Sequence, residues 1–254
     1  MKRAWRWLLP GAAAYLLFLV LNTPAAWLAG RLQSRLPAVQ LAGVQGSAFA
    51  GTAAVARVQG VQIDGLRWRW RPLALFAGRL EVALEGRYRD RPLQSLAGLR
   101  LGGQPYLRDT RGRLDVQDLV VRFSRAPVEL GGDLELALAR VDFPSGGLPL
   151  VEGRLAWSPA RLAQPLQLEL GQVAWQPAPD GDDRRGGPLT ARGGQLQVDG
   201  ELFYAAGGDY SLEGRLRASG TLPDAVARAL QTFAEYRDGT WYLDLSGKIP
   251  VPRQ

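Results

Sequence analysis

The chain has 254 residues, of which 46% are hydrophobic and 22% charged, and it carries a formal net charge of +7. This composition is typical of a folded globular protein and excludes an intrinsically disordered one. The sequence contains neither cysteine nor histidine, which excludes disulfides and thiolate metal sites and removes the commonest general base. A non-enzymatic role is therefore the better starting hypothesis, and no cofactor or metal is expected.

The N-terminal region predicts a membrane helix. Three basic residues lie within the first six positions, and no charged residue follows between Trp7 and Gly30. Because a helix rises about 1.5 Å per residue, this stretch is long enough for a hydrocarbon core of roughly 30 Å. The basic start is expected to stay inside the cell. Residues 1–6 would then form a cytoplasmic tail, 7–30 a signal-anchor helix and 31–254 a periplasmic domain.

A cleaved signal peptide is the alternative interpretation of the same segment. Thr23-Pro24-Ala25 is an acceptable cleavage site after a basic and then an apolar region. The apolar character continues beyond that site through the sequence AAWLAG, which favours an uncleaved anchor. Under both interpretations the rest of the chain is exported across the inner membrane. In a Gram-negative cell the protein is therefore expected at the inner membrane, with its C-terminal domain in the periplasm.

From about residue 38 onward, apolar and polar residues alternate with the period of half-buried strands. The segments with this pattern are 78–88, 133–141, 151–157, 166–175, 195–204, 209–218 and 239–247. Gly207 and Gly208 separate two of them and predict a hairpin turn, because glycine adopts positive φ without steric cost. The exported part is predicted to be one mainly antiparallel β-sheet domain.

The alternation also predicts which side chains share a face. Within residues 78–88, Leu80 and Val82 fall on the apolar face. Glu81 and Glu85 fall on the opposite, polar face. The triplet Gly-Arg-Leu recurs at 78–80, 112–114, 153–155 and 214–216. Because inward glycines permit bending, the triplets favour a curved sheet, unless they are only strand starts after turns.

One amphipathic helix is predicted within residues 221–239. Its apolar positions recur at helical spacing: Leu222, Val226, Leu230 and Phe233. Pro223 and Asp224 lie in its first turn and Gly239 follows its end, as in a capped helix. Three other segments break the strand pattern. Residues 71–78 and 91–98 are predicted to be short helical turns or loops, and 176–188, rich in Pro, Gly and charge, is predicted to be an exposed loop.

Several patterns that could indicate chemistry are better explained by structure. The aspartates of the 176–188 loop lack the closing Glu of a calcium loop. The sequence GSAFAG at 46–51 lacks the Lys of a phosphate-binding loop and the glycine spacing of a dinucleotide site. In RWRWR at 67–71, a strand would put Trp68 and Trp70 on one side and the arginines on the other. This predicts a buried aromatic row with a solvated charged face, not a nucleic-acid site.

The order of motifs resembles one bacterial family. A basic start and a membrane helix lead to GSAFAG, and then to GLRWRWRPLALFAGRLEVAL at 65–84. This order is similar to protein N of the type II secretion system, whose members have a cluster of Gly, small residues and Trp before a Trp-Pro-Leu segment. Phe49 stands where Trp is usual. Residues 149–171 and 207–250 are also similar to the family, whereas 90–145 match poorly.

The resemblance implies an accessory inner-membrane component of the machine that carries folded proteins across the outer membrane. Its implied partners are other inner-membrane secretion components and, through the N-terminal helix, membrane lipid. It implies no reaction, no nucleic acid and no small-molecule substrate. The implied fold is a curved, largely antiparallel AsmA-like sheet with one or two short helices after the transmembrane helix.

Two other functions remain as alternatives at this point. One is an AsmA-like periplasmic envelope protein that holds or transfers lipid along an apolar groove. The other is a carboxylate-based periplasmic hydrolase. No catalytic, cofactor-binding or metal-binding residue is assigned. The candidate structural or interaction residues are Gly46, Phe49, Gly51, Trp68, Trp70, Pro72, Leu73, Trp157, Gly214, Trp241 and Gly247.

Overall fold

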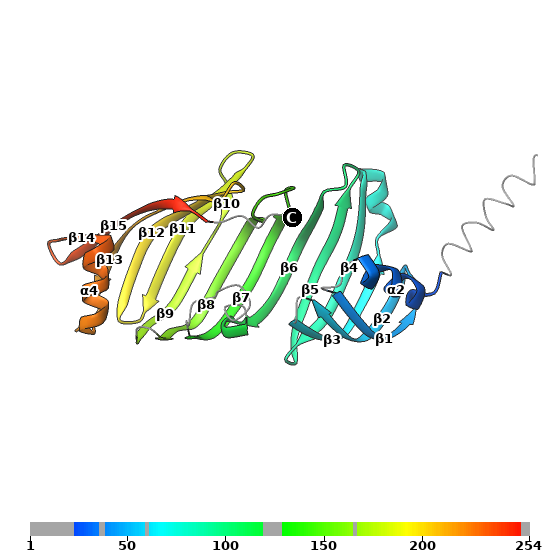
Figure 1. The fold of residues 1–254 in the computed structure, drawn as a ribbon, viewed down its shortest axis with the longest axis horizontal. Coiled ribbons are helices and arrows are strands. Elements are labelled where there is room, and N and C mark those ends of the chain that lie inside the picture. Colours follow the sequence, from blue (N-terminus) through cyan, green and yellow to red (C-terminus); the bar gives the residue numbers. More distant parts are fainter. Residues whose placement is uncertain (1–22, 36–38, 59–60, 119–128, 165–166, 250–254) are drawn as a thin grey trace, which may run out of the picture. The chain divides into compact units, whose positions relative to one another are not determined.

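A computed structural model of the chain describes residues 23–35, 39–58, 61–118, 129–164 and 167–249 (Figure 1). Most of the described residues lie in antiparallel strands, and helices are few. The prediction of a mainly β, largely antiparallel protein is therefore confirmed. The chain divides into two compact units: Met1–Ala77 with Glu81–Pro92, and Gly78–Leu80 with Leu93–Gln254.

The first unit is a helix followed by an antiparallel meander. Its elements are α2 (Ala25–Arg35), β1 (Val39–Gly46), β2 (Ala50–Val58), β3 (Val61–Trp70), the 3₁₀ helix η1 (Pro72–Ala77) and β4 (Arg79–Tyr88). Each strand pairs with the next one along the chain, from β1 to β4. In β3 the alternation holds as predicted, because Trp68 and Trp70 are half-buried and Arg67 and Arg69 are exposed.

Helix α2 contains the last part of the segment predicted to cross the membrane. It contacts β1, and its Ala25 and Ala29 are buried. The Gln33 amide nitrogen donates to the carbonyl oxygen of Leu41 at 3.1 Å. Within the described part of the chain, no helix has the length and apolar character to span a bilayer. Residues 7–22 lie outside the described residues, so the anchor stays a prediction.

The second unit consists of a long series of antiparallel strands with one helix. Its elements are β5 (Arg91–Arg100), β6 (Pro105–Asp115), β7 (Glu129–Asp142), β8 (Leu150–Gln164), β9 (Leu168–Trp175), β10 (Ala178–Pro179), β11 (Arg184–Gly193), β12 (Leu196–Ala205), β13 (Asp209–Ala218), α4 (Asp224–Phe233), β14 (Ala234–Arg237) and β15 (Thr240–Lys248). The strand order is β5-β6-β7-β8-β9-β11-β12-β13-β15-β14, and β10 pairs with β11. In Figure 1 these strands run from green to red.

A small apolar core lies at the C-terminal end of the second unit. Leu196, Leu216 and Trp241 are buried together, and Leu222 and Leu230 pack against them from α4 and the residues before it. The predicted amphipathic helix is thus confirmed for residues 224–233. The prediction that Phe233 belongs to the apolar face of this helix is wrong, because Phe233 is 60% exposed. The chain changes there from helix to strand, so Phe233 leaves the apolar side of the helix.

The region after α4 is a hairpin that the prediction missed. Strands β14 and β15 pair with Arg237 opposite Thr240. Asp238 and Gly239 form the two-residue turn, with φ of 48° and 76°. Positive φ at both positions is the type I′ geometry that Asp-Gly favours. Gly239 therefore closes a hairpin and does not mark the end of the helix.

The predicted exposure of Glu81 is also wrong. Glu81 was predicted on the polar face of its strand, yet only 4% of the residue is exposed. Its carboxylate lies 3.3 Å from the Arg71 guanidinium, and the Arg71 backbone N–H donates to the Glu81 carbonyl at 2.8 Å. A buried carboxylate is tolerated when an opposite charge accompanies it. Leu80, predicted to face inward, is half exposed.

Two of the three irregular segments also differ from expectation. Residues 91–98 were expected as a helical turn or loop but form most of β5, which pairs with β6. Pairing with a neighbouring strand overrides local preference here. The predicted loop 176–188 contains β10 and the start of β11, and Arg185 within it is buried. Residues 71–78 do form a short helical turn, η1.

Candidate functional site

The predicted residues between 46 and 70 come together in the first unit. The Phe49 and Trp70 rings lie with centroids 4.9 Å apart. The Trp68 indole nitrogen donates to the carbonyl oxygen of Ser47 at 3.2 Å. The same turn also meets the chain before α2, because the Ala48 N–H donates to the carbonyl oxygen of Thr23 at 2.9 Å. The motif GSAFAG thus fixes the start of the β-structure to the segment that precedes α2.

Two glycines in this motif have steric roles. Gly46 has φ of +90°, a conformation that side chains rarely adopt. At Gly51 a Cβ atom would lie 2.6 Å from the carbonyl oxygen of Gln45 and closer still to the Trp68 ring. The absence of a side chain at Gly51 therefore leaves room for the Trp68 ring beside β2. The small residues of the motif serve packing and turn geometry.

The remaining predicted residues of this unit lie on an exposed apolar turn. Pro72 and Leu73 begin η1, where Leu73 is 78% and Phe76 is 92% exposed. Leu75 is partly exposed as well. Apolar side chains with this exposure contribute little to a core, and exposed apolar patches are typical of surfaces that contact a partner or a membrane. We call Leu73, Leu75 and Phe76 the η1 knob.

The polar face of the first unit carries a cross-strand row over β1 to β4. Gln45, Thr52, Arg67 and Glu85 lie directly opposite one another on successive strands. Two shallow hollows of about 460 and 530 Å³ share these four residues as lining. Arg69 lines one hollow and Arg87 the other. The face offers guanidinium groups to an anionic or hydrogen-bonding partner.

The predicted residues of the second unit have structural positions that do not form one cluster. Trp157 in β8 donates its indole N–H to the carbonyl oxygen of Gly131 at 2.9 Å. Trp241 in β15 is buried in the small core, and its ring centroid lies 4.5 Å from that of Tyr236. Gly214 lies opposite Gly200, and a Cβ atom at Gly247 would come within 2.9 Å of the Tyr210 ring. These residues support the sheet itself.

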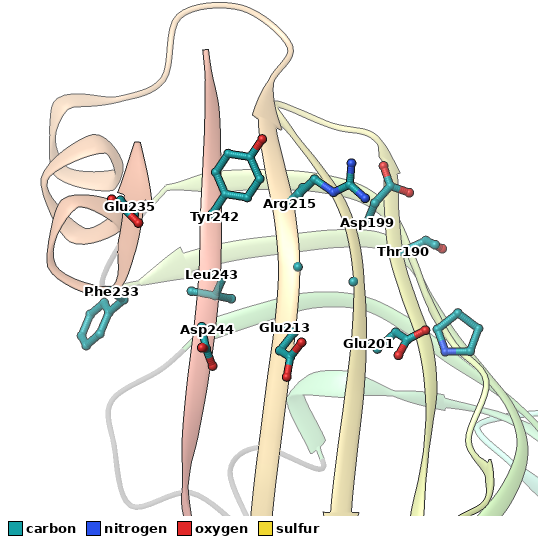
Figure 2. Close-up of a pocket in the computed structure, with 13 residues that line it drawn as sticks. Thr190, Asp199, Glu201, Glu213, Arg215, Phe233, Glu235, Tyr242, Leu243 and Asp244 are labelled. Carbon is teal, nitrogen blue, oxygen red and sulfur yellow. The ribbon is translucent and has the colours of Figure 1, made fainter. Parts of the chain in front are cut away.

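A larger hollow of about 790 Å³ lies on the polar face of β11, β12, β13 and β15 (Figure 2). Register places Glu201 opposite Glu213, and Glu213 opposite Asp244, on three neighbouring strands. We call these three residues the carboxylate row. Like charges in directly opposed positions repel each other, and among the described residues none of the three has an ion-pair or hydrogen-bond partner.

The next row of the same face is partly neutralised. Asp199 lies opposite Arg215, which lies opposite Tyr242. The Arg192 guanidinium hydrogen-bonds to the Asp199 carboxylate, and this bond lowers the pKa of Asp199 below its ordinary value. Phe233, which is 60% exposed, also lines the hollow. The hollow thus joins unpaired negative charge to exposed apolar surface.

Behind β11 and β12, Tyr204 joins three segments of the second unit. Its hydroxyl donates to the carbonyl oxygen of Pro149 at 2.6 Å and accepts from the Val151 N–H at 2.9 Å. Its ring lies 5.8 Å from that of Trp175. Burial raises the pKa of the Tyr204 hydroxyl above its ordinary value. These contacts hold the hydroxyl as a fixed structural donor.

The described residues contain no group of three or more Asp, Glu, His or Cys arranged to hold a metal ion. The surfaces that stand out are the η1 knob, the arginine-lined hollows and the carboxylate row. Each of them can bind a partner, by apolar contact or by charge. Leu73 was among the predicted interaction residues, and this assignment stays a prediction. The carboxylate row was missed, because its members come from three strands whose register is set only in the fold.

Comparison with known proteins identifies the family. Residues 37–244 match the family described as Type II secretion system (T2SS), protein N. The chain belongs to this family. The resemblance inferred from the order of motifs is thereby confirmed, and the match covers most of the described strands. Protein N is a component of a bacterial secretion machinery, so the family gives this chain a place among envelope components.

Two curated relatives carry the name Type II secretion system protein N. The one from Vibrio cholerae serotype O1 is 32% identical over 140 residues, which cover 53% of this chain and 55% of that protein. The one from Klebsiella pneumoniae is 28% identical over 253 residues, which cover 94% of this chain and 90% of that protein. The chain thus spans about half the length of the Vibrio relative. No solved structure matches the present chain.

Proposed function

We propose that this protein is a non-enzymatic component of the type II secretion machinery that takes part in export of folded proteins across the outer membrane. The observation that carries the proposal is the family match over residues 37–244, which includes nearly all the described strands. The surfaces described above offer apolar area and charge for binding a partner. The function of the chain is then to contact other inner-membrane components of the machine.

The proposed location is the inner membrane, with the β-structure in the periplasm. Residues 7–22 are uncharged and predominantly apolar, and they directly precede Thr23, whose carbonyl accepts a hydrogen bond from the GSAFAG turn. A helix through these residues would hold the first unit close to the bilayer. Extraction of membranes with carbonate tests the anchor: the protein should stay in the pellet, and its release would contradict the anchor.

The η1 knob and the arginine-lined hollows are the proposed contact surfaces of the first unit. Leu73 and Phe76 offer apolar area, and Arg67 and Arg69 offer charge. Aromatic residues and Arg are enriched in partner-binding surfaces. Replacing Leu73 and Phe76 together by Ser should weaken such contacts without unfolding the domain.

Co-purification from detergent tests the proposed function. The tagged full chain is isolated from cells that express the whole secretion machine, and the secretion components that elute with it are quantified. We expect enrichment over a tagged unrelated single-pass inner-membrane protein. The Leu73→Ser/Phe76→Ser variant should give less enrichment at an unchanged melting temperature. Equal recovery with the unrelated protein would contradict membership of the working machine.

A lipid-holding role is the second candidate function. The observation that favours it is that Leu66, Trp68 and Trp70, on the apolar face of β3, are only half-buried, so part of the apolar surface of the strands stays accessible. In an AsmA-like curved sheet this surface would form a groove for acyl chains. Mass spectrometry of the purified chain tests this role, because a stoichiometric phospholipid should survive detergent exchange. Loss of all lipid would exclude it.

A further inference from the structure

Strand β15 has a partner along its whole length on one side only. It pairs with β13 from Trp241 to Lys248. On the other side it pairs with β14, but only from Thr240 to Leu243. Among the described strands none pairs with Asp244–Lys248 on the β14 side. In Figure 2 the part of β15 below Leu243 has no strand beside it on that side. We call Asp244–Lys248 the open edge.

The ladder shows which backbone groups the open edge presents. The Ile249 N–H donates to the carbonyl oxygen of Gly208 at 2.8 Å, towards β13. Because backbone groups alternate sides along an antiparallel strand, the odd-numbered residues of β15 bond to β13. The N–H and C=O groups of Asp244, Ser246 and Lys248 therefore point away from β13, into the open edge. Unpaired groups in such a row are a template for another strand.

The side chains next to the open edge form two different rows. On the polar face, the carboxylate row of Glu201, Glu213 and Asp244 ends at the open edge. On the other face, Leu202, Leu212 and Leu245 lie opposite one another and form the leucine row, which ends there too. Phe233, exposed and lining the same hollow as Asp244, is an apolar wall beside this end of the row.

We propose that the open edge accepts an extended segment of a partner protein as an added strand. The added strand carries Arg or Lys beside Asp244, where it extends the carboxylate row with the opposite charge. The residue next to this Arg or Lys in the added strand is apolar, and it extends the leucine row beside Leu245. Main-chain hydrogen bonds give such a complex its affinity, and alternate side chains give its specificity. The inference depends on the proposed function in one respect: it takes the partner to be a protein.

A second copy of this chain fits the open edge less well. Two β15 strands paired antiparallel about Ser246 would place Lys248 of one copy beside Asp244 of the other. The same pairing puts Gly247 beside Leu245, so the leucine row would end without an apolar neighbour. A different protein with a basic and an apolar residue in alternation satisfies both rows.

The test uses the full chain in detergent and a fluorescent nine-residue peptide in which Val alternates with Arg and Thr. We expect saturable binding with a Kd in the range of about 1–100 μM, as main-chain pairing with few side-chain contacts gives weak complexes. Hydrogen exchange should slow at the amides of Asp244, Ser246 and Lys248. A matched peptide with Glu in place of Arg should bind at least tenfold more weakly.

Ser246→Pro is the decisive variant. Its ring removes an N–H that faces the open edge and no N–H that bonds to β13, so the strand should tolerate it. We expect an unchanged melting temperature and at least a tenfold loss of peptide affinity. Ser246→Ala keeps the N–H and should bind within about twofold of the parent. Neutralising the carboxylate row with Glu201→Gln, Glu213→Gln and Asp244→Asn should lower the affinity for the Arg peptide only roughly fivefold, because exposed ion pairs are weak.

Three outcomes would overturn the inference. One is the absence of saturable binding of the Arg peptide, and another is peptide binding that Ser246→Pro leaves unchanged. The third is a dimer in light scattering that this variant converts to monomer, which would assign the edge to a second copy. Co-purification with secretion components is measured separately. Its success without peptide binding would overturn only the strand-addition site, and its failure with intact binding would overturn only the proposed function.

Discussion

Phe49 and Trp70 lie in tilted ring contact, with centroids 4.9 Å apart, and join the β1–β2 turn to the end of β3. The Trp70 N–H also donates to the carbonyl oxygen of Phe49 at 2.7 Å. Phe49→Ala keeps this backbone bond but removes a half-buried ring. We expect a loss of about 1.5–2 kcal/mol in the free energy of unfolding, less than the 3–5 kcal/mol typical of a fully buried Phe. Denaturant unfolding followed by tryptophan fluorescence measures it.

Phe76→Ala is the matched control for that variant. Phe76 is an equal-sized side chain of the same unit, but it is almost fully exposed in the η1 knob. Its removal should change stability by less than about 0.5 kcal/mol. Equal stability losses in the two variants would show that the Phe49 ring has no special packing role.

Gly51→Ala should destabilise the first unit by about 2 kcal/mol. A Cβ atom there meets the Trp68 ring and lies 2.6 Å from the carbonyl oxygen of Gln45, and overpacking of this kind costs roughly 1–3 kcal/mol. Gly102→Ala is the control, since a Cβ atom at Gly102 has no neighbour within 4 Å. Thermal melting of both variants tests the contrast, and a neutral Gly51→Ala would show that Trp68 can move aside.

Much of the β-structure could be predicted from the sequence, because the alternation of apolar and polar residues is a local signal. The segment predicted at 209–218 coincides with β13, and the predicted turn at Gly207 and Gly208 joins β12 to β13. The turn Asp238-Gly239 carries an equally local signal. It was missed because the helical spacing up to Phe233 led to an interpretation of the whole segment 221–239 as one helix.

Contacts between distant residues could not be predicted in the same way. Glu81 has the spacing of an outward residue, and its burial depends on Arg71, which the turn at η1 brings over it. The carboxylate row depends on the register of three strands, since Glu201 and Asp244 are 43 residues apart in sequence. The open edge depends on where β14 ends. Each of these features is set by pairing and not by local pattern.

Tyr204→Phe should change how stability depends on alkaline pH. Burial raises the pKa of the Tyr204 hydroxyl above 10.0 in the folded chain. A raised folded pKa means that its stabilising contribution is fully present below pH 10 and is lost as pH rises through the folded pKa. The variant should lack this alkaline loss. It should also be about 1–2 kcal/mol less stable at neutral pH, because the bonds to Pro149 and Val151 disappear.

Tyr242→Phe is the control for the alkaline measurement. Tyr242 is 45% exposed on the polar face of β15, and its replacement leaves the Tyr204 bonds to Pro149 and Val151 in place. The alkaline loss of stability assigned to Tyr204 should therefore remain in this variant. A parent-like alkaline loss in Tyr204→Phe would assign that loss to another group.

Arg185 and Glu152 form a largely buried ion pair between β11 and β8, with the Arg185 Nη2 atom 2.9 Å from the Glu152 carboxylate. The Arg185 Nη1 atom also donates to the carbonyl oxygens of Gly181, Asp182 and Arg184. Arg185→Leu leaves the carboxylate and these carbonyls without a donor, so we expect a loss of about 3 kcal/mol in denaturant unfolding. Adding Glu152→Leu should restore part of it. Arg184→Ala, an exposed neighbour, should lose less than about 1 kcal/mol, and an equal loss there would contradict a special role for the buried pair.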